Sequence, residues 1–489
     1  MALNRPRRLV VLAICSMSLL IVGLDTTIVN VALPAIHRSF HASLSGLQWT
    51  VDAYTLVLAS LLMLAGSTAD RVGRRRTFQT GLVVFSLGSL LCALAPSIGL
   101  LVGARVLQAI GGAMLNPVAM SIIRNVFEDP RERAQAIGVW GAVFGLSMAL
   151  GPIVGGVLVD AISWRAVFLV NVPVGVLAIA LTAAFVPESR APRPRRIDPV
   201  GQLLVIVALA SLTYAIIEGH RAGWTSFEIL GLFGLSIACF AGLVWYELRR
   251  EEPLLEVRFF RSAPFSGASA MAIALFAATG GFLFLNTLYL QDARGLSALH
   301  AGLYTLPMAA MIFVFAPISG RLVGSRGARP SLVIGGLAVL ASGLMLTGLT
   351  PGTSRVALFG AYVIFGLGGG MVNPPITNTA VSGMPPAQAG VAAAVASTSR
   401  QVGMTLGVAV VGAVAGGAAG LGAGIDRHFA AATHPGWWIV AALGLLVTVL
   451  GALSTTRWAR QTAERIADQP RTSSAAINRR YAAKEGLRV

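Results

Sequence analysis

The chain has 489 residues, of which 55% are hydrophobic and only 12% are charged. Soluble domains carry about 25% charged residues, so this composition excludes an ordinary soluble fold and indicates a membrane protein. The formal net charge of +17 would favour nucleic-acid binding in a soluble protein, but here the arginines lie between long apolar runs and not along one basic face. We therefore expect membrane lipid around the chain and no nucleic-acid partner.

Apolar runs recur along the whole chain. A membrane-spanning helix needs about 20 mostly apolar residues at about 1.5 Å each, and this criterion predicts an all-α integral membrane protein of about fourteen spans. In chain order the spans are 9–35, 47–69, 77–96, 98–123, 134–159, 164–186, 200–217, 225–246, 263–290, 299–323, 330–350, 355–383, 387–416 and 435–456.

Most of the 37 Lys and Arg residues fall at the two termini and in the loops on one side of these spans. Because cytoplasmic loops are enriched in Lys and Arg, we expect a multi-pass protein of the cytoplasmic (inner) membrane with both termini in the cytoplasm. The first apolar run contains Asp25 and continues past Ala35 without a clear cleavage site, which predicts a retained span and not a signal peptide. The tail from about residue 458 is polar and basic, which predicts a mobile cytoplasmic segment.

An internal repeat divides the chain. GARVLQAIGGAMLNP at 103–117 aligns without gaps on GAYVIFGLGGGMVNP at 360–374, with eight identities in fifteen positions. We expect a six-helix half at 1–196, a two-helix insertion at 197–258, a second six-helix half at 259–457 and a tail at 458–489. Repeats of this kind build transporters whose substrate site lies between the halves near the bilayer midplane, and whose halves rock against each other.

The repeat also separates packing residues from charged ones. Its glycines and its Asn-Pro pair occur in both copies, which favours a role in helix packing and bending. Arg105, in contrast, aligns with Tyr362. Asp25 aligns with Gly281 when the segments after them are matched. The buried charges thus belong to the N-terminal half, and packing symmetry alone does not require them.

Six segments match the motifs of a known family. They are LDTTIVNVALP at 24–34, GSTADRVGRRR at 66–76, RVLQAIGG at 105–112, GPIVGG at 151–156, WRAVFLVNVPVG at 164–175 and RQVG at 400–403. With them the chain resembles the fourteen-span drug:proton antiporter branch of the major facilitator superfamily. The resemblance implies a secondary active transporter, not an enzyme, that exports amphipathic small molecules or drugs in exchange for protons.

The resemblance also assigns two motifs. The loop after the second span is similar to the family's cytoplasmic gate, carried here by Gly66, Asp70, Arg71, Gly73, Arg74 and Arg75. The fifth span is similar to the segment associated with antiport, carried here by Gly151, Pro152, Gly155 and Gly156. The chain departs from the family pattern at Ala109, where a glycine is usual, and the second copy of the loop has Gly324 in place of Asp70. In the gate, we expect Asp70 to stabilise the N-terminus of a facing helix.

Asp25, Arg105 and Asp52 are the candidate proton-coupling residues, with either Asp25 or Asp52 as the main proton carrier. A charge at the bilayer centre costs at least about 2.5–3.5 kcal/mol and is therefore usually functional or paired. Asp25 lies roughly 15 Å and Arg105 roughly 10 Å below the outer ends of their spans, so the two share a depth. Asp52, at about 8 Å by the same count, is a rival partner for Arg105. Our hypothesis is that Asp25 takes a proton from outside and that substrate and proton compete for this network. A purely structural ion pair is the alternative.

Polar residues of both halves are candidates for lining a substrate cavity. Arg105 and Gln108 lie on one face of their span with Asn116, and such a face must point into the bundle and not toward lipid. Arg400 has no acidic partner in the spans of its own half, so it contacts either a backbone carbonyl or an anionic group of a substrate. The full predicted set is Asn30, Gln108, Asn116, Asn286, Asn373, Arg400 and Gln401.

Other classes of site leave no signature in the sequence. We find no Walker loop, metal-ligand cluster or nucleophile elbow, so we expect no metal and no cofactor, with the proton as coupling ion. All six histidines fall in or beside predicted outer loops. We expect them to be solvated loop residues, and sensors of external acidity are the alternative.

The alternatives to drug export are a dedicated exporter of one native metabolite and, from another class, a polytopic membrane enzyme. We expect the chain to function as a monomer.

Overall fold

Long helices make up the computed structural model of the chain, which describes residues 4–191, 197–250, 253–381, 389–419 and 429–467. Within these ranges, 14 spans are long and apolar enough to cross a membrane, which confirms the predicted fold class. The helices up to the insertion are α1 (Arg5–Phe40), α2 (Leu44–Val72), α3 (Arg74–Leu94), α4 (Ile98–Val126), α5 (Pro130–Ala161), α6 (Ala166–Leu169) and α7 (Asn171–Phe185).

The inserted helices are α8 (Pro199–Ala222) and α9 (Phe227–Glu247). A short 3₁₀ turn, η1 (Val257–Arg261), leads into α10 (Ala263–Leu288), which ends in a π-helical turn, η2 (Tyr289–Ala293). The remaining helices are α11 (Ala298–Tyr304), α12 (Leu306–Arg326), α13 (Ala328–Leu346), α14 (Arg355–Val381), α15 (Ala389–Ala419), α16 (Phe429–Ala432), α17 (His434–Ser454) and α18 (Arg457–Ala467).

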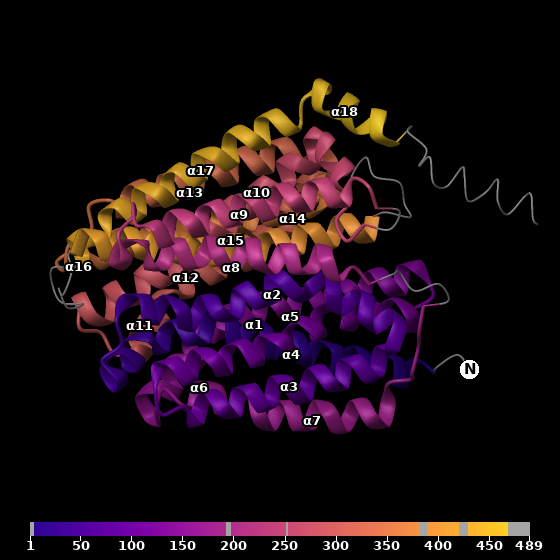
Figure 1. Cartoon of the computed structure of the whole chain (residues 1–489), viewed down its shortest axis with the longest axis horizontal. Helices are drawn as coiled ribbons and strands as arrows, with labels where there is room; N and C mark the ends of the chain where they lie inside the picture. Colours follow the sequence, from indigo (N-terminus) through magenta and orange to yellow (C-terminus); the bar gives the residue numbers. More distant parts are fainter. Residues whose placement is uncertain (1–3, 192–196, 251–252, 382–388, 420–428, 468–489) are drawn as a thin grey trace, which may run out of the picture.

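The helices form two bundles that lie side by side (Figure 1). One bundle contains α1 to α7 and the other α10 to α17, while the inserted helix α8 packs against α2 of the first bundle and α15 of the second. We call the end of the molecule where α1 begins and α18 lies the terminal end, and the opposite end, with α6, α11 and α16, the distal end. The exact division of the chain at residues 196, 258 and 457 stays a prediction.

Polar residues that precede apolar runs begin several helices. The side chains of Ser43, Ser97 and Ser226 accept hydrogen bonds from backbone N–H groups in the first turns of α2, α4 and α9. Asp129 does the same for two N–H groups of α5. Each cap satisfies donors that a helix start would otherwise leave unpaired. The caps therefore explain why the helices begin at these positions.

Two predicted spans are each broken once. The span 164–186 is divided at Val170 between α6 and α7, and the span 299–323 is divided at Thr305 between α11 and α12. Pro307 lies at the start of α12, and Pro173 lies in the first turn of α7. Proline lacks a backbone N–H and is best tolerated in the first turn of a helix, so each proline favours a fresh start over a continuous span.

The tail is not wholly irregular, which corrects the prediction of a mobile segment from about residue 458. Residues Arg457–Ala467 form α18, whose Ala459 and Ala463 are buried. The hydroxyl of Thr462 accepts a hydrogen bond of 2.9 Å from the backbone N–H of Ala263 at the start of α10. The helix therefore docks on the second bundle through small residues, which a count of polar residues does not detect. Residues 468–489 lie outside the described residues.

Glycines of the repeat allow close helix contact in both bundles. A Cβ atom added at Gly111 of α4 would overlap the backbone nitrogen of Phe85 in α3. At Gly368, the repeat counterpart in α14, an added Cβ would lie 2.8 Å from the carbonyl oxygen of Gly335 in α13. Small residues of this kind let two helix backbones approach, as expected for membrane bundles.

A larger side chain at Gly111 is expected to destabilise the N-terminal bundle. Gly111→Val would force α3 and α4 apart, at a cost of about 1–3 kcal/mol or more for overpacking. The same substitution at Gly103 of α4, where nothing lies within 4 Å of an added Cβ, is the matched control. Thermal unfolding of the purified variants in detergent should show a lower midpoint for Gly111→Val alone. Equal midpoints would contradict this packing role.

Candidate functional site

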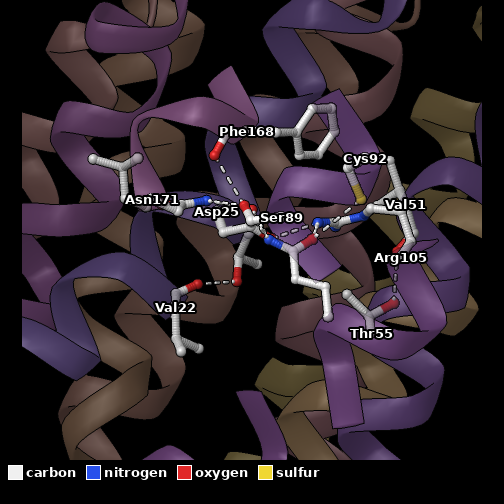
Figure 2. Close-up of polar contacts among 12 residues, drawn as sticks. Val22, Asp25, Val51, Thr55, Ser89, Cys92, Arg105, Phe168 and Asn171 are labelled. Atoms are coloured by element: carbon white, nitrogen blue, oxygen red, sulfur yellow. Dashed lines mark hydrogen bonds and ion pairs between the residues drawn. The ribbon is translucent and has the colours of Figure 1, made fainter. Parts of the chain in front are cut away.

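An ion pair lies inside the N-terminal bundle. Asp25, in the middle of α1, is 0% exposed, and Arg105 of α4 is 1% exposed. The Nη1 atom of Arg105 donates to Oδ2 of Asp25 (Figure 2). The two residues that the depth count placed together are thus in direct contact.

Two amides complete the surroundings of the Asp25 carboxylate. Its Oδ1 atom accepts a 2.9 Å hydrogen bond from Nε2 of Gln108 and a 3.1 Å bond from Nδ2 of Asn171, the first residue of α7. Together with Arg105, both carboxylate oxygens have donors. Donors of this kind stabilise the charged form of a carboxylate against the cost of burial.

Arg105 is held by more than its acidic partner. Its Nε donates 3.0 Å to the carbonyl oxygen of Thr50, and its Nη1 also donates 2.7 Å to Oε1 of Gln108. Its guanidinium group lies 4.1 Å from the ring centroid of Tyr54, which is a cation–π contact. Since Thr50 and Tyr54 belong to α2, the network joins α1, α2, α4 and α7.

A serine connects the two amides. The hydroxyl of Ser89 in α3 accepts 3.1 Å bonds from both Gln108 and Asn171 and donates 2.9 Å to the carbonyl oxygen of Phe168 (Figure 2). Three residues of this network, Ser89, Asn171 and Tyr54, are not among the predicted site residues. The signal for Asn171 was its position inside the motif WRAVFLVNVPVG. Tyr54 and Ser89 carry no comparable signal.

The expectation that Asp52 competes for Arg105 is wrong. Arg105 bonds to Asp25, Gln108 and Thr50, whereas neither carboxylate oxygen of Asp52 has a hydrogen-bond partner in the described structure. The cause is the rotation of α2. Tyr54 points toward Arg105, and Asp52, two residues earlier, lies about 200° around the helix from it.

The predicted cavity residues do not form one cluster. Gln108 belongs to the Asp25 network, and Asn286 accepts a hydrogen bond from the hydroxyl of Tyr362. Arg400 donates to the hydroxyl of Thr377, with no acidic partner among the described residues. Oxygen atoms without hydrogen-bond partners remain on three of the predicted side chains, and these are Asn30, Asn116 and Asn373. Gln401 is half-buried, one residue after Arg400 on α15.

The gate motif forms a turn at the terminal end. Asp70 makes an ion pair of 2.9 Å with Arg74. The acid at a helix N-terminus is instead Glu188, which the sequence analysis did not single out: its oxygens accept bonds of 3.1 Å and 3.3 Å from the backbone N–H groups of Arg75 and Arg76. Gly73 has a φ of +129°, and an added Cβ would lie 2.7 Å from Glu188. A glycine is therefore required here.

The remaining gate residues flank this turn. Gly66 lies near the terminal end of α2, where an added Cβ would lie 3.9 Å from Pro117 of α4. Arg71 is the second-last residue of the same helix.

The fifth-span motif lies against two other helices. Cβ atoms added at Gly151 and Gly155 would overlap Thr27 and Ile28 of α1. An added Cβ at Gly156 would meet the backbone of Leu299 in α11, which belongs to the second bundle. From the other side, an added Cβ at Gly302 of α11 would overlap the carbonyl oxygen of Pro152.

Polar contacts also join the two bundles at the distal end. The carboxylate of Asp160 in α5 accepts bonds of 3.2 Å and 2.8 Å from the backbone N–H groups of Ala298 and Leu299, at the start of α11. The side chain of Gln291 donates 2.9 Å to the carbonyl oxygen of Val31 in α1. These contacts hold the distal end closed in this conformation.

Comparison with known proteins agrees with this architecture. Residues 15–408 match the model of the Major Facilitator Superfamily. The multidrug resistance protein Stp of Mycobacterium tuberculosis is 39% identical over 404 residues, which cover 82% of this chain and 75% of the relative. The tetracenomycin C resistance and export protein of Streptomyces glaucescens is 37% identical over 392 residues, covering 79% and 72%.

Among solved structures, an inward-facing, occupied bacterial homolog of the human lysosomal transporter Spinster superposes with a TM-score of 0.67. Its sequence is 19% identical, and the match covers 96% of this chain and 100% of that one.

The chain belongs to the Major Facilitator Superfamily. It is a multi-pass membrane transporter of small molecules and not an enzyme, as predicted. The buried charged network around Asp25 and Arg105 therefore lies inside one bundle of a membrane transporter.

Breaking the ion pair should destabilise the protein more than replacing it. Arg105→Gln leaves Asp25 without its cationic donor, at a cost of about 3–5 kcal/mol for an unpaired buried charge. The double variant Asp25→Asn/Arg105→Gln removes both charges and is expected to recover part of that loss. Thermal unfolding of the wild type, both single variants and the double variant measures the coupling. Strict additivity would show that the two side chains do not interact.

A side chain at Gly156 is expected to prevent distal closure. Gly156→Leu would act between α5 and α11, at an overpacking cost of about 1–3 kcal/mol, so the closed population should fall roughly five-fold or more. Gly145→Leu on the same helix is the control, because nothing lies within 4 Å of an added Cβ there. Distances between spin labels on the distal ends of the two bundles report the effect. An unchanged distance distribution in Gly156→Leu would contradict this interpretation.

Proposed function

We propose that this transporter exports drug-like amphipathic small molecules across the cytoplasmic membrane in exchange for protons. Two relatives that cover most of the chain are named for multidrug resistance and for resistance and export. The observation that carries the proposal is the fully buried ion pair between Asp25 and Arg105. A buried charged network is costly in a membrane protein and is typical of proton pathways.

The arrangement of charges supports an orientation of the protein in the membrane. In this proposal the terminal end, which holds Arg8 and the basic turn around Arg75, faces the cytoplasm because cytoplasmic segments are enriched in Lys and Arg. The distal end then faces the outside, and its closure by Asp160 and Gln291 corresponds to an inward-facing state. Opening of the distal end by rocking of the two bundles would expose the network to external protons.

Proton binding changes the bonds that Asp25 can accept. As a carboxylate it accepts from Arg105, Gln108 and Asn171 at once. A proton on the carboxylate removes its negative charge, which weakens the charge-assisted bond from Arg105 most of all. If that bond breaks, the guanidinium group of Arg105 needs another hydrogen-bond acceptor. That rearrangement supplies a physical link between proton binding and helix movement.

The driving force is sufficient for uphill export. One proton crossing the membrane supplies about 2.3 kcal/mol per 100 mV of potential and about 1.4 kcal/mol per unit of pH difference. No metal or other cofactor enters the proposed cycle. The coupling ion is the proton alone, and one chain is sufficient for the cycle because both bundles of the seam belong to it.

Substrate is proposed to bind between the bundles, where polar groups without partners come from both. Asn30 and Asn116 contribute unpartnered amide oxygens from the first bundle, and Asn373 contributes one from the second. Arg400 adds a cation whose Nε atom has no hydrogen-bond partner, and Gln401 lies beside it in sequence. A few polar groups among apolar walls suit a molecule with one polar and one apolar side.

Replacing Asp25 should abolish coupling. In liposomes with an imposed pH gradient, wild-type protein is expected to show proton flux when any of several unrelated amphipathic dyes and antibiotics is added. Asp25→Asn cannot change its charge, so this flux should fall to the level of empty liposomes. Glu228→Gln, at the exposed start of α9, is the control and should keep wild-type flux.

Two outcomes would change the proposal. Full proton-coupled flux in Asp25→Asn would remove this residue from the mechanism. Flux with only one chemical scaffold in the panel would favour the alternative, a dedicated exporter of one native metabolite.

A further inference from the structure

The seam between α2 and α15 has its own polar contacts. Gln48 and Thr55 of α2 lie on one face of the helix, two turns apart. Nε2 of Gln48 donates 3.2 Å to the carbonyl oxygen of Val408 and 2.9 Å to that of Ala409. The hydroxyl of Thr405 donates 2.8 Å to the hydroxyl of Thr55. These bonds connect the two bundles along the distal half of α2.

Asp52 lies between these two contacts, four residues after Gln48 and three before Thr55, and so on the same face of α2. It is 0% exposed, and both of its carboxylate oxygens are buried without a hydrogen-bond partner in the described structure. The adjoining seam between α2, α8 and α15 is mainly apolar, with Leu56, Leu209 and Val402 among its residues beside the hydroxyls of Thr213 and Thr405. The closed seam gives the Asp52 carboxylate no cationic partner in the described structure, and the polar side-chain group beside it is the hydroxyl of Thr55.

Charged groups on the neighbouring helices are engaged elsewhere. Arg105 of α4 binds Asp25 of α1, and Arg400 of α15 donates to Thr377. Glu218 of α8 accepts from Trp49 and pairs with Arg221. The other titratable groups on elements packed against α2, away from the terminal end, are Tyr54 on α2 itself, Cys92 on α3, Tyr214 and His220 on α8, and His37 and Arg38 on α1. No ion pair links Asp52 to any of them in the described structure.

A charged Asp52 is therefore disfavoured in the closed seam. An ionised carboxylate that is buried without a cationic partner costs several kcal/mol, whereas the neutral acid costs far less. Separation of α2 from α15 at the distal end would give the carboxylate access to water, and it could then ionise. The two forms of the side chain thus favour two different conformations of the protein.

We propose that Asp52 is a proton-operated latch on the distal seam, distinct from the Asp25 network. Binding of a proton to the Asp52 carboxylate allows α2 and α15 to close, and loss of that proton favours opening. The proton enters and leaves from the distal side as the seam opens, so the latch adds a pH dependence to opening without adding to the protons transported. The inference rests on the rocking movement of the proposed function but not on the substrate.

Distance measurements between spin labels test the latch directly. Cysteines for labelling are placed at Ile162 and Val356, which are exposed at the distal ends of the two bundles, after replacement of Cys15, Cys92 and Cys239. Labels are attached at one pH, and distances are then measured by pulsed electron paramagnetic resonance between pH 5 and pH 8. This readout requires no substrate, so it is independent of whether the protein exports drugs.

The measurement is made in an Asp25→Asn background, which removes the carboxylate that binds Arg105. The closed form should dominate in acid and the open form should grow with rising pH, by up to about tenfold in their ratio per pH unit for one proton. Adding Asp52→Asn, which is neutral at every pH, should keep the closed form throughout. Asp52→Ser, smaller and also neutral, should do the same and guards against an effect specific to asparagine.

Two results would overturn the latch. The first is an undiminished pH dependence in the variants that lack Asp52. The second is an open distal end in Asp52→Asn at acid pH while Asp25→Asn alone is closed there. A loss of thermal stability without any change in the pH profile would likewise assign Asp52 a structural role only. Failure of drug-stimulated proton flux, with a normal pH profile of the distances, would count against the proposed function and not against the latch.

Discussion

The organisation of this protein depends on the cost of placing the Asp25 charge away from water. A carboxylate that is 0% exposed needs donors from its surroundings, and these come from two other helices. Arg105 and Gln108 are supplied by α4, and Asn171 is supplied by the start of α7. The start of α7 therefore matters to the site, since its first residue, Asn171, donates to Asp25 of α1. Local helix geometry and the charged network depend on each other.

The second bundle shows what the same architecture does without the charge. Tyr362 occupies the position of Arg105 in the repeat, and its hydroxyl donates to Asn286 of α10. A neutral pair thus joins α14 to α10 where an ion pair joins α4 to α1. Close glycine packing, at Gly111 and Gly368, is kept in both. One bundle can therefore change its bonding when a proton binds, while the other provides a partner of similar shape whose bonds do not depend on pH.

Counting residues along helices predicted depth well and rotation poorly. A rise of 1.5 Å per residue was enough to place Asp25 and Arg105 at one level, and the repeat was enough to predict two bundles. The rotation of α2 is set by packing against α15 and α4, so sequence spacing wrongly offered Asp52 to Arg105. Ser89 was not predictable because an isolated serine in an apolar span is common, and only the meeting of α3 with α4, α6 and α7 gives it partners. Glu188 was missed for a similar reason, since it lies far in sequence from the helix start that it stabilises.

The contact between α5 and α11 consists mostly of backbone. Gly156 lies against the backbone of Leu299, Gly302 against the carbonyl oxygen of Pro152, and Asp160 binds the first N–H groups of α11. A contact made of main-chain atoms does not depend on which side chains line the space between the bundles. Residues that line the substrate space can then change without altering how the two bundles move. One scaffold can therefore transport new substrates by the same movement.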